Sequence, residues 1–553
     1  MKTTNQSKSR TLQSLALVLV LVLTVSVFGQ REERVTTLWQ PINYDVTITL
    51  NEQLSEISHA RVVLKGLSVS ENLELIDLDF GEMAIDAVTL DGQPAKFDRT
   101  KDRLNIHLPR KLDIDGRFEI AVEYHGRPKD GLIFANDKDG KPSATGDNWP
   151  DRVHHWIPSL DHPSAKATTR FTVTAPAKEL VVANGKLDSV VNDSQTTRTW
   201  TYTEAVPIPP YCMIIAVGEY AKLEPSGPAI TPLTYYVPQA DAKFALQGFA
   251  PAAPSLKFFS ETVAPYPYEK LALIVGATRF GGMENSSAIV FSTNVLSPRS
   301  NPRISRAFNI SEGLEQVVAH EIAHQWFGDS VTEVSWADLW LSEGFATYFA
   351  GLFVQKHDGE EAFQAYMKRA ADTYFKYEKT KRSPIHDRDT DVLMDLLNAN
   401  NYQKGAWVLH MLRSELGDKA FFDGIRRYYK ENKDSVASTK DVQKALEESS
   451  GKKLEKFIAS WIFGAGHPQY ELSWKWNQSR KSVRLTLRQL QLESAFPNRV
   501  PIEVMVGSQR VSIVLEPTDK VLVKDFKLKR APSEVKLDPN NTILKDVVIK
   551  AGG

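Results

Sequence analysis

The chain has 553 residues, of which 42% are hydrophobic and 24% are charged, and its formal net charge at pH 7 is −1. This composition is typical of globular protein, and the length suffices for about three or four domains. Because nucleic-acid binding usually requires a basic face or tail, the balanced charge argues against a nucleic-acid partner.

The N-terminal segment has the pattern of a secretory signal peptide. Cationic residues precede an apolar run over residues 15–28, and Val27-Phe28-Gly29 fits a small-residue cleavage site. The run is shorter than the roughly twenty residues that span a bilayer, so a signal peptide over residues 1–29 is favoured over an uncleaved membrane anchor. We therefore expect an exported chain, periplasmic or extracellular, with no stable membrane insertion after cleavage.

The single cysteine, Cys212, limits the covalent chemistry of the chain. No intramolecular disulfide can form, and large exported proteins without disulfides are more typical of bacteria than of animal secretion. Cys212 lies in an apolar run without a neighbouring base. A buried core residue is therefore expected rather than a catalytic thiol.

Residues 30–224 carry β-strand patterns. Apolar and polar residues alternate over residues 44–50, 170–174 and 197–203, with Gly, Asn and Asp turns between such stretches. These patterns predict an N-terminal β domain.

Helical periodicity dominates residues 225–466, for example over residues 359–379, 404–416 and 440–449. Alternation then returns over residues 467–553. The sequence therefore predicts a mainly helical middle domain followed by a small C-terminal β-sandwich.

A glycine pair in the middle domain is the first candidate binding motif. Gly281 and Gly282 precede Met283 and Glu284. Glycine backbone can approach a ligand closely because no side chain intervenes, and a carboxylate beside it could bind an ammonium group. Taken alone, such a pair is more often a simple turn.

The strongest chemical signal is His320-Glu321-Ile322-Ala323-His324, followed after 18 residues by Glu343. Histidines at positions i and i+4 share one face of a helix, so both can reach one metal ion. A distant glutamate can complete a three-ligand zinc site with an open fourth position, and Glu321 is placed as a general base for water. Helical spacing of the surrounding apolar residues argues against the alternative of an ordinary surface helix. We therefore predict a hydrolase with one zinc ion per chain.

Together, the two motifs resemble those of the aminopeptidase N and leukotriene hydrolase family of zinc metallopeptidases. The match extends over residues 318–328, 338–345 and 401–405, and loosely over both β regions. It implies a multidomain α+β fold with an N-terminal antiparallel β domain at residues 30–224. A thermolysin-like, mainly helical catalytic domain at residues 225–466 and a small β-sandwich at 467–553 would follow.

The resemblance implies roles for the metal-site residues. His320, His324 and Glu343 would bind zinc. Glu321 would take a proton from the attacking water and return it to the leaving amine. Tyr402 would donate a hydrogen bond to the oxyanion.

The resemblance also implies how substrate binds. Glu284 would hold the free α-ammonium of a peptide, while Gly281, Gly282 and Met283 would contact the peptide, with glycine backbone aligning it as an added strand. An internal peptide segment would leave the Glu284 anion buried without a partner, at a cost of several kcal/mol. We therefore predict a zinc aminopeptidase acting on peptides with a free N-terminus.

Two rival functions are a thermolysin-like endopeptidase and a catalytically inactive, zinc-stabilised peptide-binding module. A binding module needs neither a general base nor an oxyanion donor, so the presence of Glu321 and Tyr402 argues against it. The sequence does not determine the oligomeric state, and a monomer is the working expectation.

Several positions depart from the family pattern. Asp329 and Ser342 stand where many members have asparagine, so the surroundings of the metal are expected to differ. A family glutamine near residues 153–163 cannot be placed, and the three histidines of that stretch are expected to form structural hydrogen bonds rather than a second metal site. The chain also stops where relatives continue into a large helical domain, so epoxide hydrolysis is not expected.

Overall fold

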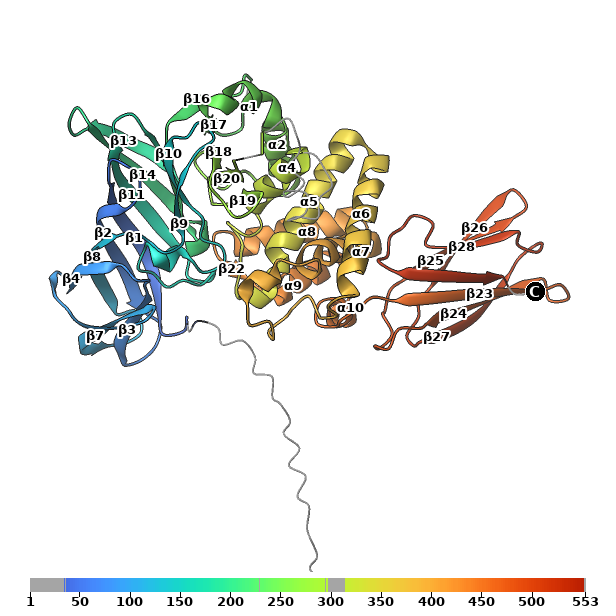
Figure 1. Ribbon diagram of the computed structural model, residues 1–553. Coiled ribbons are helices and arrows are strands. Elements are labelled where there is room, and N and C mark those ends of the chain that lie inside the picture. Colours follow the sequence, from blue (N-terminus) through green and yellow to red (C-terminus); the bar gives the residue numbers. More distant parts are fainter. Residues whose placement is uncertain (1–33, 35, 228, 294, 297–313, 552–553) are drawn as a thin grey trace, which may run out of the picture.

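The computed structural model describes residues 34, 36–227, 229–293, 295–296 and 314–551. Along the chain lie a β-rich region, a region that contains most of the helices, and a second β region that projects from the helical one (Figure 1). The predicted signal peptide falls outside the described residues. In the described ranges no helix is both long and apolar enough to cross a bilayer.

The N-terminal region is built on an eight-stranded sheet with the order β13-β14-β11-β1-β2-β8-β4-β5. All neighbouring strands are antiparallel except β1 and β11, which run parallel. The alternation predicted over residues 44–50 and 170–174 lies in these two strands. The strands are β1 (Trp39–Leu50), β2 (Ile57–Ser68), β4 (Ala84–Leu90), β5 (Gln93–Pro94), β8 (Arg117–Gly126), β11 (Ala167–Pro176), β13 (Lys186–Asn192) and β14 (Thr197–Ile208).

Two smaller sheets complete this region. One has the order β3-β7-β6 and the other β12-β15-β10-β9. Cys212 is buried and free, as predicted. The Nδ1 atom of His154 lies 2.8 Å from Asp161 Oδ2, in agreement with a structural hydrogen bond. The strands are β3 (Leu73–Asp79), β6 (Lys96–Thr100), β7 (Arg103–Leu112), β9 (Leu132–Asn136), β10 (Pro142–Gly146), β12 (Leu180–Ala183) and β15 (Ile215–Gly218).

The middle region begins with a five-stranded sheet of order β16-β17-β18-β20-β19. β17, β18 and β20 run parallel, while the edge strands β16 and β19 are antiparallel to their neighbours. Strand β16 precedes residue 224, so strand pairing assigns the last residues of the predicted N-terminal domain to the middle region. The strands are β16 (Tyr220–Leu223), β17 (Leu233–Pro238), β18 (Leu271–Gly276), β19 (Gly282–Met283) and β20 (Ala288–Ser292).

The helices of the middle region pack beside this sheet. The three periodic stretches predicted from the sequence correspond to α6, α7 and α9. Helix α5 is buried along residues 340–354, which explains why it shows little amphipathic pattern. The helices are α1 (Ala242–Gly248), α2 (Ala252–Thr262), α4 (Leu314–His324), α5 (Trp340–Asp358), α6 (Glu360–Glu378), α7 (Gly405–Leu416), α8 (Asp418–Asn432), α9 (Thr439–Ser450) and α10 (Glu455–Trp461). A short parallel pair, β21 (Thr332–Glu333) and β22 (Val436–Ala437), accompanies them.

Two glycines allow α5 to approach the start of α7. A Cβ atom on Gly405 would lie 3.0 Å from the Cα of Gly344, and one on Gly344 would lie 3.0 Å from the carbonyl oxygen of Asn401. Side chains here would therefore separate the two elements. The contact brings the π-helical turn Asn400–Lys404 against the part of α5 that follows Glu343.

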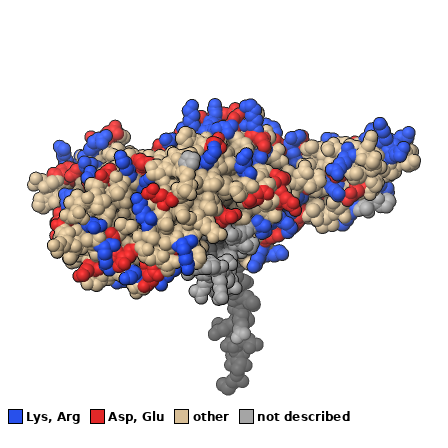
Figure 2. Space-filling model, turned by 90° about the horizontal axis from the view of Figure 1, so that it is seen from above, with Lys and Arg blue, Asp and Glu red and all other residues tan. Residues whose placement is uncertain are grey.

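The C-terminal region is the predicted β-sandwich. One sheet has the order β27-β24-β23-β29 and the other β26-β25-β28. One apolar core continues from the helices into the sandwich, for example through Trp461 and Phe496, whose ring centroids are 4.7 Å apart. Both signs of charge are interspersed over the face shown in Figure 2. The strands are β23 (Gln469–Asn477), β24 (Ser482–Gln489), β25 (Val500–Val506), β26 (Gln509–Leu515), β27 (Val521–Lys527), β28 (Glu534–Leu537) and β29 (Asp546–Ala551).

The close approach of α5 and α7 yields a stability prediction. Gly405→Ala should lower the free energy of unfolding by about 1–3 kcal/mol, because the new methyl group meets backbone that cannot move alone. Urea unfolding followed by circular dichroism measures this. In the control variant Gly424→Ala the methyl group meets the side-chain ends Ser449 Oγ at 2.6 Å and Leu446 Cδ2 at 2.7 Å, which can rotate, and the nearest backbone atom, Leu446 Cα, is 3.2 Å away. A smaller loss is therefore expected there. Equal stability of Gly405→Ala and wild type would contradict the prediction.

Candidate active site

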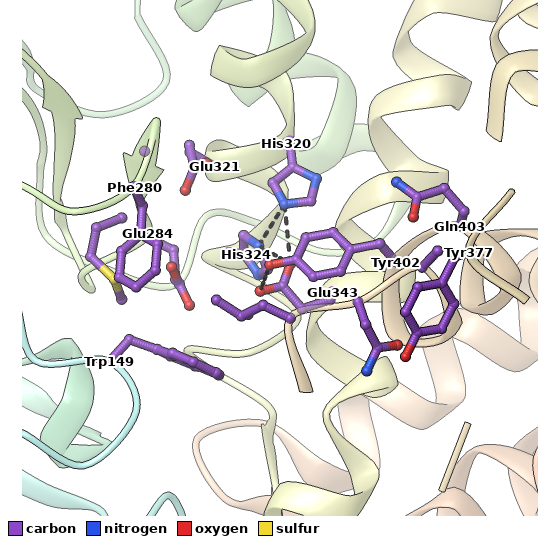
Figure 3. A pocket seen from close by; sticks show the side chains of 15 residues that line it. Trp149, Phe280, Glu284, His320, Glu321, His324, Glu343, Tyr377, Tyr402 and Gln403 are labelled. Atoms are coloured by element: carbon purple, nitrogen blue, oxygen red, sulfur yellow. Dashed lines mark hydrogen bonds and ion pairs between the residues drawn. The ribbon is translucent and has the colours of Figure 1, made fainter. Parts of the chain in front are cut away.

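The metal-site residues predicted from the sequence converge between two helices. His320 and His324 lie one turn apart on α4, and Glu343 lies in the first turn of α5. The two Nε2 atoms are 3.0 Å apart, and Glu343 Oε2 lies 3.2 Å from that of His320 and 3.3 Å from that of His324. All three side chains are buried. Their donor atoms therefore face one common point (Figure 3).

This donor set fits a zinc ion. Two imidazole nitrogens and a carboxylate oxygen are ligands that zinc prefers in catalytic sites. Tetrahedral ligands with bonds of about 2.0–2.2 Å are about 3.3–3.6 Å apart, close to the spacing seen here. Burial alone would raise the pKa of Glu343, but the His324 charge and hydrogen bonds from both imidazoles hold it at about 2. The carboxylate is therefore ready to bind a cation.

The Nδ1 atom of His324 has two polar neighbours. It lies 3.1 Å from the carbonyl oxygen of Phe327 and 3.0 Å from the hydroxyl oxygen of Ser342. Because a carbonyl only accepts, a proton on Nδ1 can be donated to it, and this leaves the Nε2 lone pair for the metal. Ser342, one of the departures from the family pattern, therefore contacts a predicted metal ligand directly.

The other departure, Asp329, belongs to a buried network behind the site. Its carboxylate accepts hydrogen bonds from Gln325 Nε2 at 2.8 Å and from the thiol of Cys212 at 3.3 Å. Both contacts involve side chains that are fully buried. The Asp329 side chain therefore contacts Gln325, the residue next to the predicted ligand His324, rather than His324 itself.

Tyr402 lies in the π-helical turn that precedes α7. Its hydroxyl donates a hydrogen bond to Glu343 Oε1 at 2.7 Å, and its ring is nearly parallel to that of His320. Such π-helical turns are frequent at functional sites. The turn thus places a hydroxyl donor at the edge of the predicted metal site.

Gly282 has a role that the sequence did not reveal. A Cβ atom at this position would lie 2.4 Å from the carboxyl carbon of Glu321. The glycine therefore makes room for the predicted base, in addition to any contact of its backbone with substrate. Gly281 accepts a backbone hydrogen bond from Ser292, which holds this segment against β20.

Glu284 lies immediately after β19 and is only 6% exposed. Carboxylate oxygens of Glu284 and Glu321 and a ring nitrogen of His324 lie within 4.8 Å of one another. Burial raises the pKa of Glu284 to about 7, although the charge of His324 opposes this shift. The group therefore sits in a place where a nearby cation would stabilise its charged form.

A cavity of about 270 Å³ connects these groups. Figure 3 shows Trp149, Phe280 and Glu284 on one side of the histidines, with Tyr377 and Gln403 on the other. Trp149 comes from the N-terminal region and Tyr377 from α6. Sequence reasoning missed both, since neither belongs to a local motif. The lining residues are Trp149, Phe280, Gly282, Met283, Glu284, His320, Glu321, His324, Glu343, Tyr377, Leu397, Asn398, Ala399, Tyr402 and Gln403.

Two histidines from one helix and a glutamate from the next, beside the edge of a mixed sheet, define the zinc metallopeptidase class. The chain belongs to peptidase family M1. The Peptidase M1 N-terminal domain matches residues 40–212, and the Peptidase family M1 domain matches residues 249–461.

Similar proteins agree with this assignment. A probable aminopeptidase 1 from Sulfurisphaera tokodaii is 25% identical over 92% of this chain and 63% of its own length. A leucyl aminopeptidase from Saccharolobus solfataricus is 25% identical over 86% of this chain and 60% of its own. The chain thus spans about three-fifths of the length of these relatives. The structure of an M1 zinc metallopeptidase from Deinococcus radiodurans matches with a TM-score of 0.64 and 25% identity, covering 78% of this chain and 95% of that one.

The contact of Ser342 with His324 predicts an effect on metal binding. Ser342→Ala should weaken zinc affinity about tenfold or more, because the ligand loses a polar neighbour that orients its ring. Titration against a competing chelator measures the affinity. Ser330→Ala is the matched control, because its buried hydroxyl contacts Tyr429 and Asp434 instead of a metal ligand. Equal affinities of the two variants would contradict the prediction.

Proposed function

We propose that the chain is a zinc-dependent aminopeptidase that releases single N-terminal residues from peptides. The observation that carries this proposal is the buried carboxylate of Glu284, which shares one cavity with Glu321 and the predicted zinc ligands. The aminopeptidase names of the relatives support it.

The position of Glu284 favours exopeptidase over endopeptidase action. A free α-ammonium would pair with its carboxylate and place the first carbonyl group next to the metal site. An internal peptide segment has no charge there, so the anion would stay buried without a partner. Because an endopeptidase has no use for this carboxylate, the geometry favours cleavage after the first residue.

Glu321 is the proposed general base. One zinc ion held by His320, His324 and Glu343 would supply Lewis acidity and make water acidic near neutral pH. Burial raises the pKa of Glu321, which makes its carboxylate a better acceptor for a proton from water. The carboxyl group then delivers that proton to the leaving amine.

Tyr402 is the proposed oxyanion donor. In the structure its hydroxyl donates to Glu343, and burial raises its pKa well above the usual value, so it stays protonated. A protonated phenol at the edge of the site can transfer its hydrogen bond to the negative oxygen that develops on the substrate.

Strand β19 is the proposed guide for the peptide backbone. Among the described residues it is the outermost strand of its sheet and pairs with β20 on one side only. An extended peptide can therefore add to its open edge, with Gly282 and Met283 beside the scissile bond.

We also propose that the chain is exported to the periplasm or extracellular space. This proposal rests on the charge and apolar pattern of residues 1–29. Cell fractionation combined with determination of the mature N-terminus would decide it.

The role of Glu284 predicts strong dependence on a free amine. N-acetylation of an aminoacyl-coumarin substrate should lower kcat/KM at least about 30-fold, which corresponds to about 2 kcal/mol for loss of one partner of a buried ion pair. Glu284→Gln should reduce this preference while zinc remains bound. Equal rates on free and acetylated substrates would refute the aminopeptidase assignment.

The roles of Glu321 and Tyr402 predict losses in turnover without loss of metal. Glu321→Gln should lower kcat about 10²–10⁴-fold, and Tyr402→Phe about 10²–10³-fold. Steady-state kinetics and zinc content are measured on the same preparations. If Glu321→Gln retained turnover, the base would have to be another group.

A further inference from the structure

The segment that carries Glu284 is held by side chains from distant parts of the chain. Residues 284–287 join β19 to β20, and Ser287 has a positive φ of 61°. Asn285, Ser286 and Ser287 are fully buried. A buried connection with left-handed backbone needs partners for its polar groups, because unpaired buried groups are costly.

Gln325 links this segment to the metal helix. It directly follows the ligand His324, and its amide nitrogen donates to the carbonyl oxygen of Glu284 at 2.8 Å. Its amide oxygen accepts from the backbone N–H of Ser287 at 2.8 Å. One fully buried amide therefore holds both ends of the Glu284 segment at a fixed place beside the metal ligand.

The N-terminal region fixes the same segment from the other side. Ser287 Oγ donates to Glu204 on β14 at 3.0 Å and accepts from the backbone N–H of Gly185 at 2.7 Å. The side-chain amide of Asn184 donates to the carbonyl oxygen of Ser286 at 2.7 Å. The Glu284 segment is thus clamped between the metal helix and the N-terminal β-strands.

We propose that Gln325 and Ser287 are positioning residues that set the distance from the Glu284 carboxylate to the metal site. Through this distance they restrict the enzyme to α-amino substrates. This inference rests on the proposed function. A β-amino acid carries its amine one methylene farther from the carbonyl group, a difference of about 1.5 Å in chain length. Because misplacement by about 1 Å can lower a rate about 100-fold, a rigid Glu284 segment excludes such substrates.

The test compares alanyl- and β-alanyl-coumarin amides in wild type, Gln325→Met and Ser287→Ala. Methionine approximates the length of glutamine but forms none of its amide hydrogen bonds. We expect wild type to prefer the α-amino substrate at least about 100-fold, and each variant to reduce the ratio of kcat/KM values about tenfold or more. KM for the α-amino substrate should rise more than kcat falls. Zinc content and circular dichroism verify that each variant is folded.

Tyr235→Phe is the matched control. Tyr235 lies on β17, in the same sheet as β19 and β20 but outside the Glu284 segment. The variant removes the hydrogen bond of 3.1 Å that its hydroxyl donates to the carbonyl oxygen of Phe249. A general loss of stability would lower kcat/KM for the α-amino and the β-amino substrate by the same factor. We therefore expect Tyr235→Phe to leave the ratio of the two kcat/KM values unaltered.

The possible results separate the inference from the proposed function. Unaltered ratios in the folded variants would overturn the positioning role, and so would a wild type that accepts both substrates equally. If Gln325→Met does not fold, Ser287→Ala decides the question alone. Failure of the zinc-loaded wild type to cleave any free-amine substrate would instead refute the proposed function.

Discussion

The burial of several carboxylates around two histidines is the constraint on which the site depends. Glu284, Glu321 and Glu343 are each at most 6% exposed. Like charges at such short distances in a poorly solvated cavity are unstable unless cations balance them or protons neutralise them, and burial accordingly raises the pKa of Glu284 and of Glu321. In the proposed function, a zinc ion beside Glu343 would supply one positive charge centre, and the ammonium group of a peptide beside Glu284 would supply another. The proposed preference for a free N-terminus would therefore follow from the negative charge of these carboxylates.

The site also requires that backbone segments approach one another closely, because the buried carboxylates come from different helices and strands. Gly282 leaves space for Glu321 of α4, and the contact of Gly344 with Gly405 brings the turn of Tyr402 to α5. A methyl group at either contact would push the two elements apart and shift Glu321 or Tyr402. Gly282, Gly344 and Gly405 thus allow close approach between protein elements.

The features that could be predicted from the sequence are those that depend on residues close together in the chain. The i, i+4 spacing of His320 and His324 needs only one helix, and the three helical stretches lie within a few residues of α6, α7 and α9. Glu343 was predicted from its spacing after these histidines, and Tyr402 from the resemblance to a family. Contacts between residues that are far apart in the sequence were not predicted. The parallel pairing of β1 with β11 joins residues more than a hundred positions apart, and alternation does not specify a partner. The same holds for Trp149 and for the contact of Gln325 with Ser287.

The N-terminal β region therefore helps to build the candidate active site. It contributes Trp149 to the cavity, and it clamps the Glu284 segment through Asn184 and Glu204. A detachable recognition module would not need buried polar contacts of this kind, which are stable only when both regions are folded together. All residues that line the cavity lie between positions 149 and 403. The two family M1 domains thus contain all the described residues that line this cavity, and the contact between them holds the Glu284 segment in place.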